Sequence, residues 1–104
     1  MKPAWIALLA APCVALAQAD AQVLQARGRD ALRAMDCARC HGKHYDGWSG
    51  PSLLAAVRDG SRERFDRYVL DGSERGMPGY RSQPLVVREL DAIWAYLRAQ
   101  AELR

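Results

Sequence analysis

The amino-acid sequence predicts a small all-α protein with one domain, built from about four short helices. Its 104 residues are enough for one domain at most. Half of the residues are apolar and the formal net charge is only +3, so the chain can form a core and is not expected to be disordered. Apolar residues recur at three- and four-residue spacing, which is typical of helices. A core of this size is small, and such domains often need a disulfide, a metal or a cofactor.

Residues 1–19 are predicted to be a cleavable export signal, followed by the domain over residues 20–104. Lys2 precedes an apolar run over residues 3–17, and no charge follows before Asp20. The run is shorter than the roughly 20 residues that span a bilayer. An uncleaved N-terminal anchor is the alternative.

Small residues at the end of this run allow cleavage after Ala17 or after Ala19. Cleavage as a lipoprotein at Cys13 is less favoured. Lipoprotein signals resemble one another in having a small, flexible residue before the cysteine, and this chain has Pro12 there. Since Cys13 leaves with the signal, the mature chain is expected to keep two cysteines.

The first helix of the domain is expected to begin near Asp20, which would act as its N-cap. Gly28 inside this helix costs about 1 kcal/mol relative to Ala, and a close helix crossing would explain it. The residues that share one face are Leu24, Gly28, Ala31, Leu32 and Met35.

Three further helices are expected. A short one spans Pro51 to Arg58, with Leu53, Leu54 and Val57 facing inward. Ser61 is predicted to cap the next helix, and Gly72 to close it. The last has Pro84 near its first turn. Its apolar residues at helical spacing are Val86, Leu90, Ile93, Trp94 and Leu97.

The most specific motif is C-x-x-C-H, formed by Cys37, Cys40 and His41. This pattern is typical of covalent haem attachment. Two thiols three positions apart can each add to a vinyl group of the porphyrin, and the adjacent imidazole can then coordinate the iron. The motif therefore predicts one haem c, with its iron, bonded to the chain.

Two alternatives use the same residues. A zinc site could add His44, but its four ligands would crowd into eight residues, whereas structural zinc sites draw pairs from separated segments. A thioredoxin-like redox pair needs a βαβ surrounding, and no strand-like run flanks the motif. His44 is too near His41 along the chain to reach the opposite face of a porphyrin, so it is expected at the surface or beside a propionate.

Met77 is predicted to be the second axial ligand of the iron. Met1 leaves with the signal, and Met35 lies two residues before Cys37, on the attachment side. Met77 stands in the segment Gly76–Tyr80, where glycines permit close approach and a proline stiffens the chain. A thioether there could approach the far face of the haem. The alternative is that Met77 only fills an apolar gap.

Trp48 and Tyr45 lie in a glycine-rich loop before Pro51. Either side chain could pack against the haem edge or bond a propionate through its indole or phenol group. Trp48 is therefore a candidate cofactor-binding residue.

These motifs, in this order, resemble those of the class I c-type cytochromes. The resemblance covers the whole expected mature chain: Gly28 before C-x-x-C-H, then Gly50-Pro51-Ser52-Leu53, then Gly76–Tyr80, and a final helix with Trp94, Tyr96 and Leu97. It implies the small cytochrome c fold, wrapped round the haem, with His41 and Met77 as the axial pair. It also implies a hydrogen bond from His41 to the carbonyl of Pro51.

One departure concerns the first helix. Family members often carry an aromatic residue shortly before the first cysteine, where this chain has Leu32 and Arg33. The contact between the first and last helices is therefore expected to be built differently.

Two axial protein ligands would leave no coordination position for a substrate, which favours one-electron transfer over enzymatic chemistry. We therefore expect a monomeric periplasmic electron carrier, with no membrane association after signal cleavage. It would dock transiently at its haem edge between a donor dehydrogenase or quinol-oxidising complex and an acceptor oxidase or reductase. By family analogy, a quinoprotein dehydrogenase is one candidate donor and a terminal oxidase one candidate acceptor.

Two alternatives for the function stay open. A labile Met77 would leave an open iron for peroxide, nitrite or a diatomic gas, as in a haem enzyme. The chain could also be a cytochrome subunit bound permanently to a dehydrogenase.

The basic charge does not predict nucleic-acid binding, because only two residues are Lys and no Lys/Arg run is present. Without Lys2, 14 basic residues face 12 acidic ones, a difference of +2. Two ionised haem propionates would bring this sum near zero.

Overall fold

The computed structural model describes the backbone of residues 2–104 and the side chains of residues 13–104. Met1, and the side chains at 2–12 of the predicted export signal, lie outside this description. The described chain has no strand and five helices: α1 (Lys2–Ala34), α2 (Ala38–His41), α3 (Leu53–Asp59), α4 (Arg62–Asp71) and α5 (Pro84–Leu103). The predicted all-α class is confirmed. Among the described residues, no helix is both long enough and apolar enough to cross a membrane.

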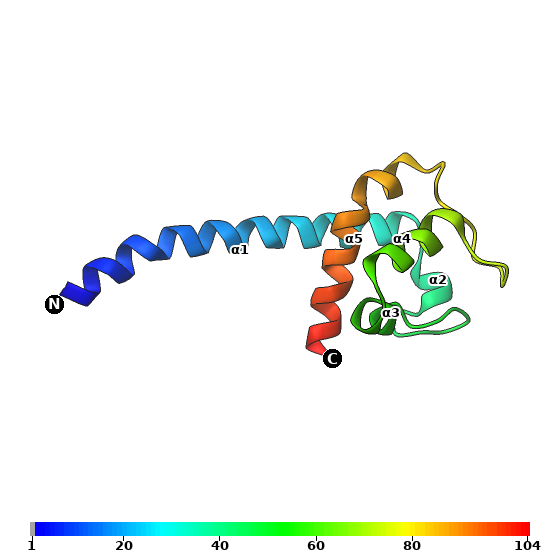
Figure 1. The fold of residues 1–104 in the computed structure, drawn as a ribbon, viewed down its shortest axis with the longest axis horizontal. Coiled ribbons are helices and arrows are strands. Elements are labelled where there is room, and N and C mark those ends of the chain that lie inside the picture. The colour runs from blue at the N-terminus through cyan, green and yellow to red at the C-terminus, as the bar shows by residue number, and fades with distance from the viewer. Residues whose placement is uncertain (1) are drawn as a thin grey trace.

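Helix α1 is much longer than predicted. It runs without interruption through Asp20, so the helix start expected there is wrong, and the predicted cleavage sites lie inside the helix. The residues on both sides of Asp20 are mainly Ala, Leu and Gln, which favour a helix, and a cap is needed only where a helix begins. The first part of α1 projects away from the other helices (Figure 1), and its side chains Val14, Leu16 and Val23 are exposed.

Helices α1 and α5 cross closely at Gly28. A Cβ atom there would lie 2.9 Å from the backbone nitrogen of Ile93 and would overlap the carbonyl of Ala92. A side chain at position 28 would therefore push the two helices apart, which confirms the predicted reason for this glycine.

An ion pair lies beside this crossing. Arg27 donates from Nε and Nη2 to the two carboxylate oxygens of Glu89, at 2.9 and 2.6 Å. Leu32, at one of the positions where the family often has an aromatic residue, is buried in the core. The contact between the first and last helices thus combines a glycine contact, an aliphatic side chain and an ion pair.

The predicted ends of the other helices are largely confirmed. Ser61 caps α4 by accepting a backbone hydrogen bond at 3.1 Å, and Gly72, with φ of 75°, follows its last residue. Pro84 occupies the first turn of α5. Helix α3 begins at Leu53 rather than Pro51, because the Ser52 side chain caps it, again at 3.1 Å.

The core lies where α5 packs against α1 and α3. Two arginines tie α3 to α5 in both directions: Arg58 donates to the carbonyl of Ala101 at 3.2 Å, and Arg98 donates to that of Val57 at 3.1 Å. The buried apolar residues of the core are Ala31, Leu32, Tyr45, Leu54, Val57, Phe65, Val86, Ile93, Leu97 and Ala101. Several of them also form the wall of a cavity.

Candidate functional site

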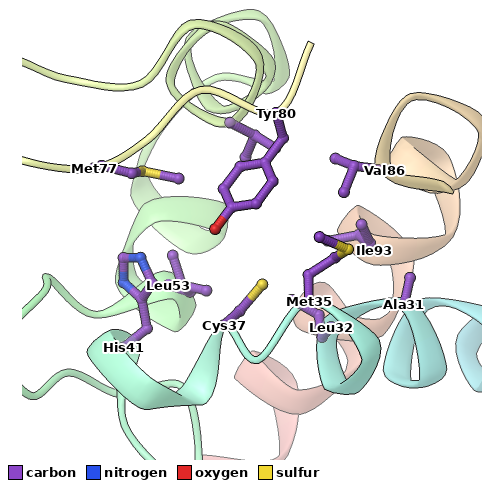
Figure 2. A pocket seen from close by; sticks show the side chains of 11 residues that line it. Ala31, Leu32, Met35, Cys37, His41, Leu53, Met77, Tyr80, Val86 and Ile93 are labelled. Carbon is purple, nitrogen blue, oxygen red and sulfur yellow. The ribbon is translucent and has the colours of Figure 1, made fainter. Parts of the chain in front are cut away.

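An apolar cavity is lined by residues from all five helices and from the chain between α4 and α5 (Figure 2). The space between these elements is about 410 Å³, including the part open to solvent. Its lining residues are Ala31, Leu32, Met35, Cys37, His41, Leu53, Val69, Met77, Tyr80, Val86 and Ile93. Four of these carry groups that could attach a haem or coordinate its iron: the thiol of Cys37, the imidazole of His41 and the thioethers of Met35 and Met77.

Helix α2 brings Cys37 and His41 to the cavity, because residues four positions apart share one face of a helical turn. The Cys37 sulfur points into the cavity (Figure 2). Burial, and then the charge of Asp36, raise the pKa of this thiol to about 11, so it is neutral at pH 7. Cys40 is exposed and lies outside the cavity lining.

The His41 ring is buried and held in one orientation. Its Nδ1 lies 2.8 Å from the carbonyl oxygen of Pro51. A carbonyl only accepts, so Nδ1–H donates this hydrogen bond, and in the neutral ring Nε2 then has the free lone pair. This is the contact that the family resemblance implies. Gly50 leaves room for the ring, since a Cβ there would lie 3.0 Å from its Nδ1 and Cε1 atoms.

Met77 faces the same cavity from the side opposite His41 (Figure 2). It lies in the chain between α4 and α5, which turns back on itself: the backbone N–H of Ser73 donates to the carbonyl of Met77 at 3.0 Å. Gly72 permits this turn, because a Cβ there would overlap the Met77 carbonyl. The structure therefore brings Cys37, His41 and Met77 to one cavity.

These residues fit a haem with its iron. Imidazole and thioether are known axial donors of haem iron, and the remaining walls suit a flat apolar macrocycle. The zinc alternative finds no support, because no three His, Cys, Asp or Glu side chains of the described residues lie close enough to form a metal site.

Three residues that were considered for this site lie away from the cavity. His44 is exposed, as expected. Trp48 is 82% exposed, and its backbone N–H donates to the carbonyl of Gly50 in a tight turn at the surface. Tyr45 is buried, but it packs edge-on against Tyr96 at a centroid distance of 6.3 Å. The structure does not bring either aromatic residue to the cavity.

Tyr80 also lines the cavity, a position that was not predicted from the sequence. Its phenol oxygen points into the cavity (Figure 2), and burial raises the pKa of the phenol. The sequence feature that could have indicated a place in the cavity is its position three residues after Met77. Met35 also lines the cavity, on the side of Ile93 rather than of Met77.

Comparison with known proteins identifies the family. Residues 24–97 match a family model described as cytochrome C oxidase, cbb3-type, subunit III. The chain is also 34% identical over 64 residues to a protein named cytochrome c-553-like from Synechocystis sp. (strain ATCC 27184 / PCC 6803 / Kazusa). That match covers 62% of this chain and 60% of the relative, so the chain spans about three fifths of the relative's length. No solved structure matches the chain. Because the family model covers most of its length, this chain belongs to the c-type cytochromes, with the small all-α cytochrome c fold and one covalently bound haem c.

Proposed function

We propose that this cytochrome is an exported electron carrier in which Cys37 and Cys40 hold the haem and His41 and Met77 are the axial ligands. The supporting observation is that His41 and Met77 face one apolar cavity from opposite sides. With both axial positions filled by the chain, no position is left for a substrate, which supports electron transfer rather than an enzymatic reaction.

The residues of the cavity would hold the haem and tune it. The haem supplies a one-electron iron couple. His41 donates Nδ1–H to Pro51, which orients the ring and makes its free nitrogen more basic. A thioether ligand at Met77 raises the reduction potential, and the apolar walls exclude water.

The proposed location is the periplasm, with residues 1–19 removed as an export signal. The exposed Val14 and Leu16 side chains support this proposal, because none of the described side chains of residues 13–19 belongs to the core. The proposed partners are a donor dehydrogenase or quinol-oxidising complex and an acceptor oxidase or reductase, met through small transient contacts.

A second candidate is favoured by the description of the matching family, which names an oxidase subunit. In this case the chain would be a cytochrome domain held permanently by an oxidase or dehydrogenase. The axial ligands would be the same, so the two candidates differ in the partner and not in the site.

The ferric absorption spectrum tests the proposed ligands. The parent holoprotein should be low-spin, with the weak long-wavelength band of methionine-sulfur ligation. Met77→Leu should abolish the band, since leucine has no donor atom. Met35→Leu is the matched control, because it removes the other thioether that lines the cavity, and it should keep the band. A high-spin parent protein, or loss of the band in Met35→Leu alone, would refute the assignment.

A further inference from the structure

Residues 72–79, here called the Met77 loop, leave α4 and return to it at nearly the same place. The backbone N–H groups of Tyr80 and Arg81 donate to the carbonyls of Val69 and Leu70, both at 3.0 Å. These carbonyls belong to the last turn of α4, where no intrahelical donor is available. We call this point of return the neck of the loop.

The backbone is closely packed at the neck. A Cβ atom at Gly79 would lie 2.7 Å from the Leu70 carbonyl oxygen, and one at Gly72 would lie 2.8 Å from the Gly79 nitrogen. Between these two glycines, the hydrogen bonds of the loop are internal: Ser73 N–H to Met77 and Gly76 N–H to Ser73. Among the described residues, every hydrogen bond that ties the loop to the rest of the protein lies at the neck.

One ion pair spans the neck on its outer side. Arg81 donates from Nε and Nη2 to Oδ1 of Asp71, at 2.9 and 2.7 Å. Asp71 is the last residue of α4, and Arg81 is the second residue after the loop. A cation here is also favourable beside the negative end of the α4 dipole. Neither side chain lines the cavity, and neither carries a donor group that faces it.

We propose that Asp71 and Arg81 are positioning residues for Met77. Their ion pair holds the neck closed, and the closed neck keeps the Met77 thioether at the cavity. When the neck opens, the loop leaves as a unit and Met77 leaves with it, because the loop has no other hydrogen-bonded attachment among the described residues. This inference rests on the proposed role of Met77 as an axial ligand.

The side chains of Arg81 and Asp71 are 65% and 50% exposed, and exposed ion pairs contribute little to stability. We therefore expect removal of the pair to have a modest effect. The backbone hydrogen bonds of the neck remain when the pair is removed. We therefore expect the competition between Met77 and an added ligand to shift by about two- to five-fold. A shift of this size is measurable in a titration.

The test is a titration of the ferric holoprotein with imidazole, which competes with Met77 and is followed by loss of the methionine-sulfur band. Asp71→Asn and Arg81→Gln should each raise the apparent imidazole affinity by about two- to five-fold. The double variant should show no larger effect than either single one. The exchange of charges, Asp71→Arg with Arg81→Asp, should return the affinity toward that of the parent protein.

The control is Asp30→Asn, which removes a carboxylate from another exposed ion pair, that of Arg29 and Asp30 in α1. Its imidazole affinity should equal that of the parent. Urea unfolding of each variant shows that the folded state dominates during the titration. Unchanged affinity in both single variants, additive effects, or an equal effect of Asp30→Asn would overturn the inference. A parent protein without the methionine-sulfur band would instead refute the proposed function, before any variant is compared.

Discussion

At the scale of single residues, Gly50 controls the orientation of the His41 ring. A Cβ atom at this position would lie 3.0 Å from two ring atoms and 3.2 Å from the Cys40 carbonyl oxygen. These distances are shorter than ordinary contacts, so a methyl group would displace the imidazole or the backbone of the loop. The 2.8 Å contact between His41 and Pro51 would be lost or lengthened.

We predict that Gly50→Ala lowers the free energy of unfolding of the holoprotein by about 1–3 kcal/mol. It should also raise the reduction potential. Without its hydrogen bond to Pro51, His41 is a less basic ligand and stabilises the ferric state less. Urea unfolding and a redox titration measure the two effects.

The neighbouring variant Ser49→Ala is the control for Gly50→Ala. It removes only a long hydrogen bond of 3.4 Å to the Cys40 carbonyl. We expect a change within about 0.5 kcal/mol and an unchanged potential. If Gly50→Ala behaves like Ser49→Ala, the His41 ring is not constrained by this glycine.

At the scale of the helices, the contact between α1 and α5 includes the buried carboxylate of Glu89. Its hydrogen bonds from Arg27 lower the pKa of Glu89. A lowered pKa means that the pair stabilises the fold fully above the ordinary glutamate pKa of about 4.3. This contribution is lost as the pH falls through the lower pKa of the folded state.

We predict that Glu89→Gln destabilises the protein at pH 7, because Arg27 loses its charged partner. The difference in unfolding free energy from the parent should be constant above about pH 5 and should shrink below about pH 4. Urea unfolding at a series of pH values measures this difference. Glu102→Gln, at an exposed position near the end of α5, is the control and should leave the free energy of unfolding at pH 7 within about 0.5 kcal/mol of the parent. A gap for Glu89→Gln that stays constant down to pH 3 would contradict the role of the ion pair.

The helices also show which features the sequence could predict. Ser61, Gly72 and Pro84 mark helix ends through local chemistry, and all three were predicted correctly. The start of α1 was predicted wrongly, because a capping residue such as Asp20 marks the start of a helix only when the preceding chain is not helical. The Arg27–Glu89 pair joins positions 62 residues apart, so it depends on how two helices cross and has no local signal.

At the scale of the whole molecule, the sequence predicted which residues carry candidate donor groups, but it did not predict their surroundings. The C-x-x-C-H spacing predicts His41 as one ligand, and setting aside Met1 and Met35 leaves Met77 as the other. The structure brings His41 and Met77 to one cavity. The outward direction of Trp48 depends on a backbone turn, and the inward direction of Tyr80 depends on the neck of the Met77 loop. Both are set by hydrogen bonds that composition and spacing do not encode.

The cavity takes residues from α1 through α5, so it lies inside the core rather than beside it. Helices α3 and α4 have only 7 and 10 residues, and isolated helices shorter than about 12–15 residues are marginal in water. Their stability must come from packing against the other helices, and each contributes one residue to the wall of the cavity, Leu53 from α3 and Val69 from α4. A covalently attached cofactor therefore contributes to the fold itself.

We predict that Cys37→Ala combined with Cys40→Ala, which prevents covalent attachment, leaves a chain with markedly less helix than the holoprotein. Far-UV circular dichroism of both proteins at equal concentration measures the difference. The single variant Cys40→Ala is the control, because the Cys37 sulfur still points into the cavity and can keep one thioether bond. Its helical signal should stay near that of the parent. Full native helicity in the haem-free double variant would show instead that the apolar contacts of α1, α3 and α5 are sufficient for the fold.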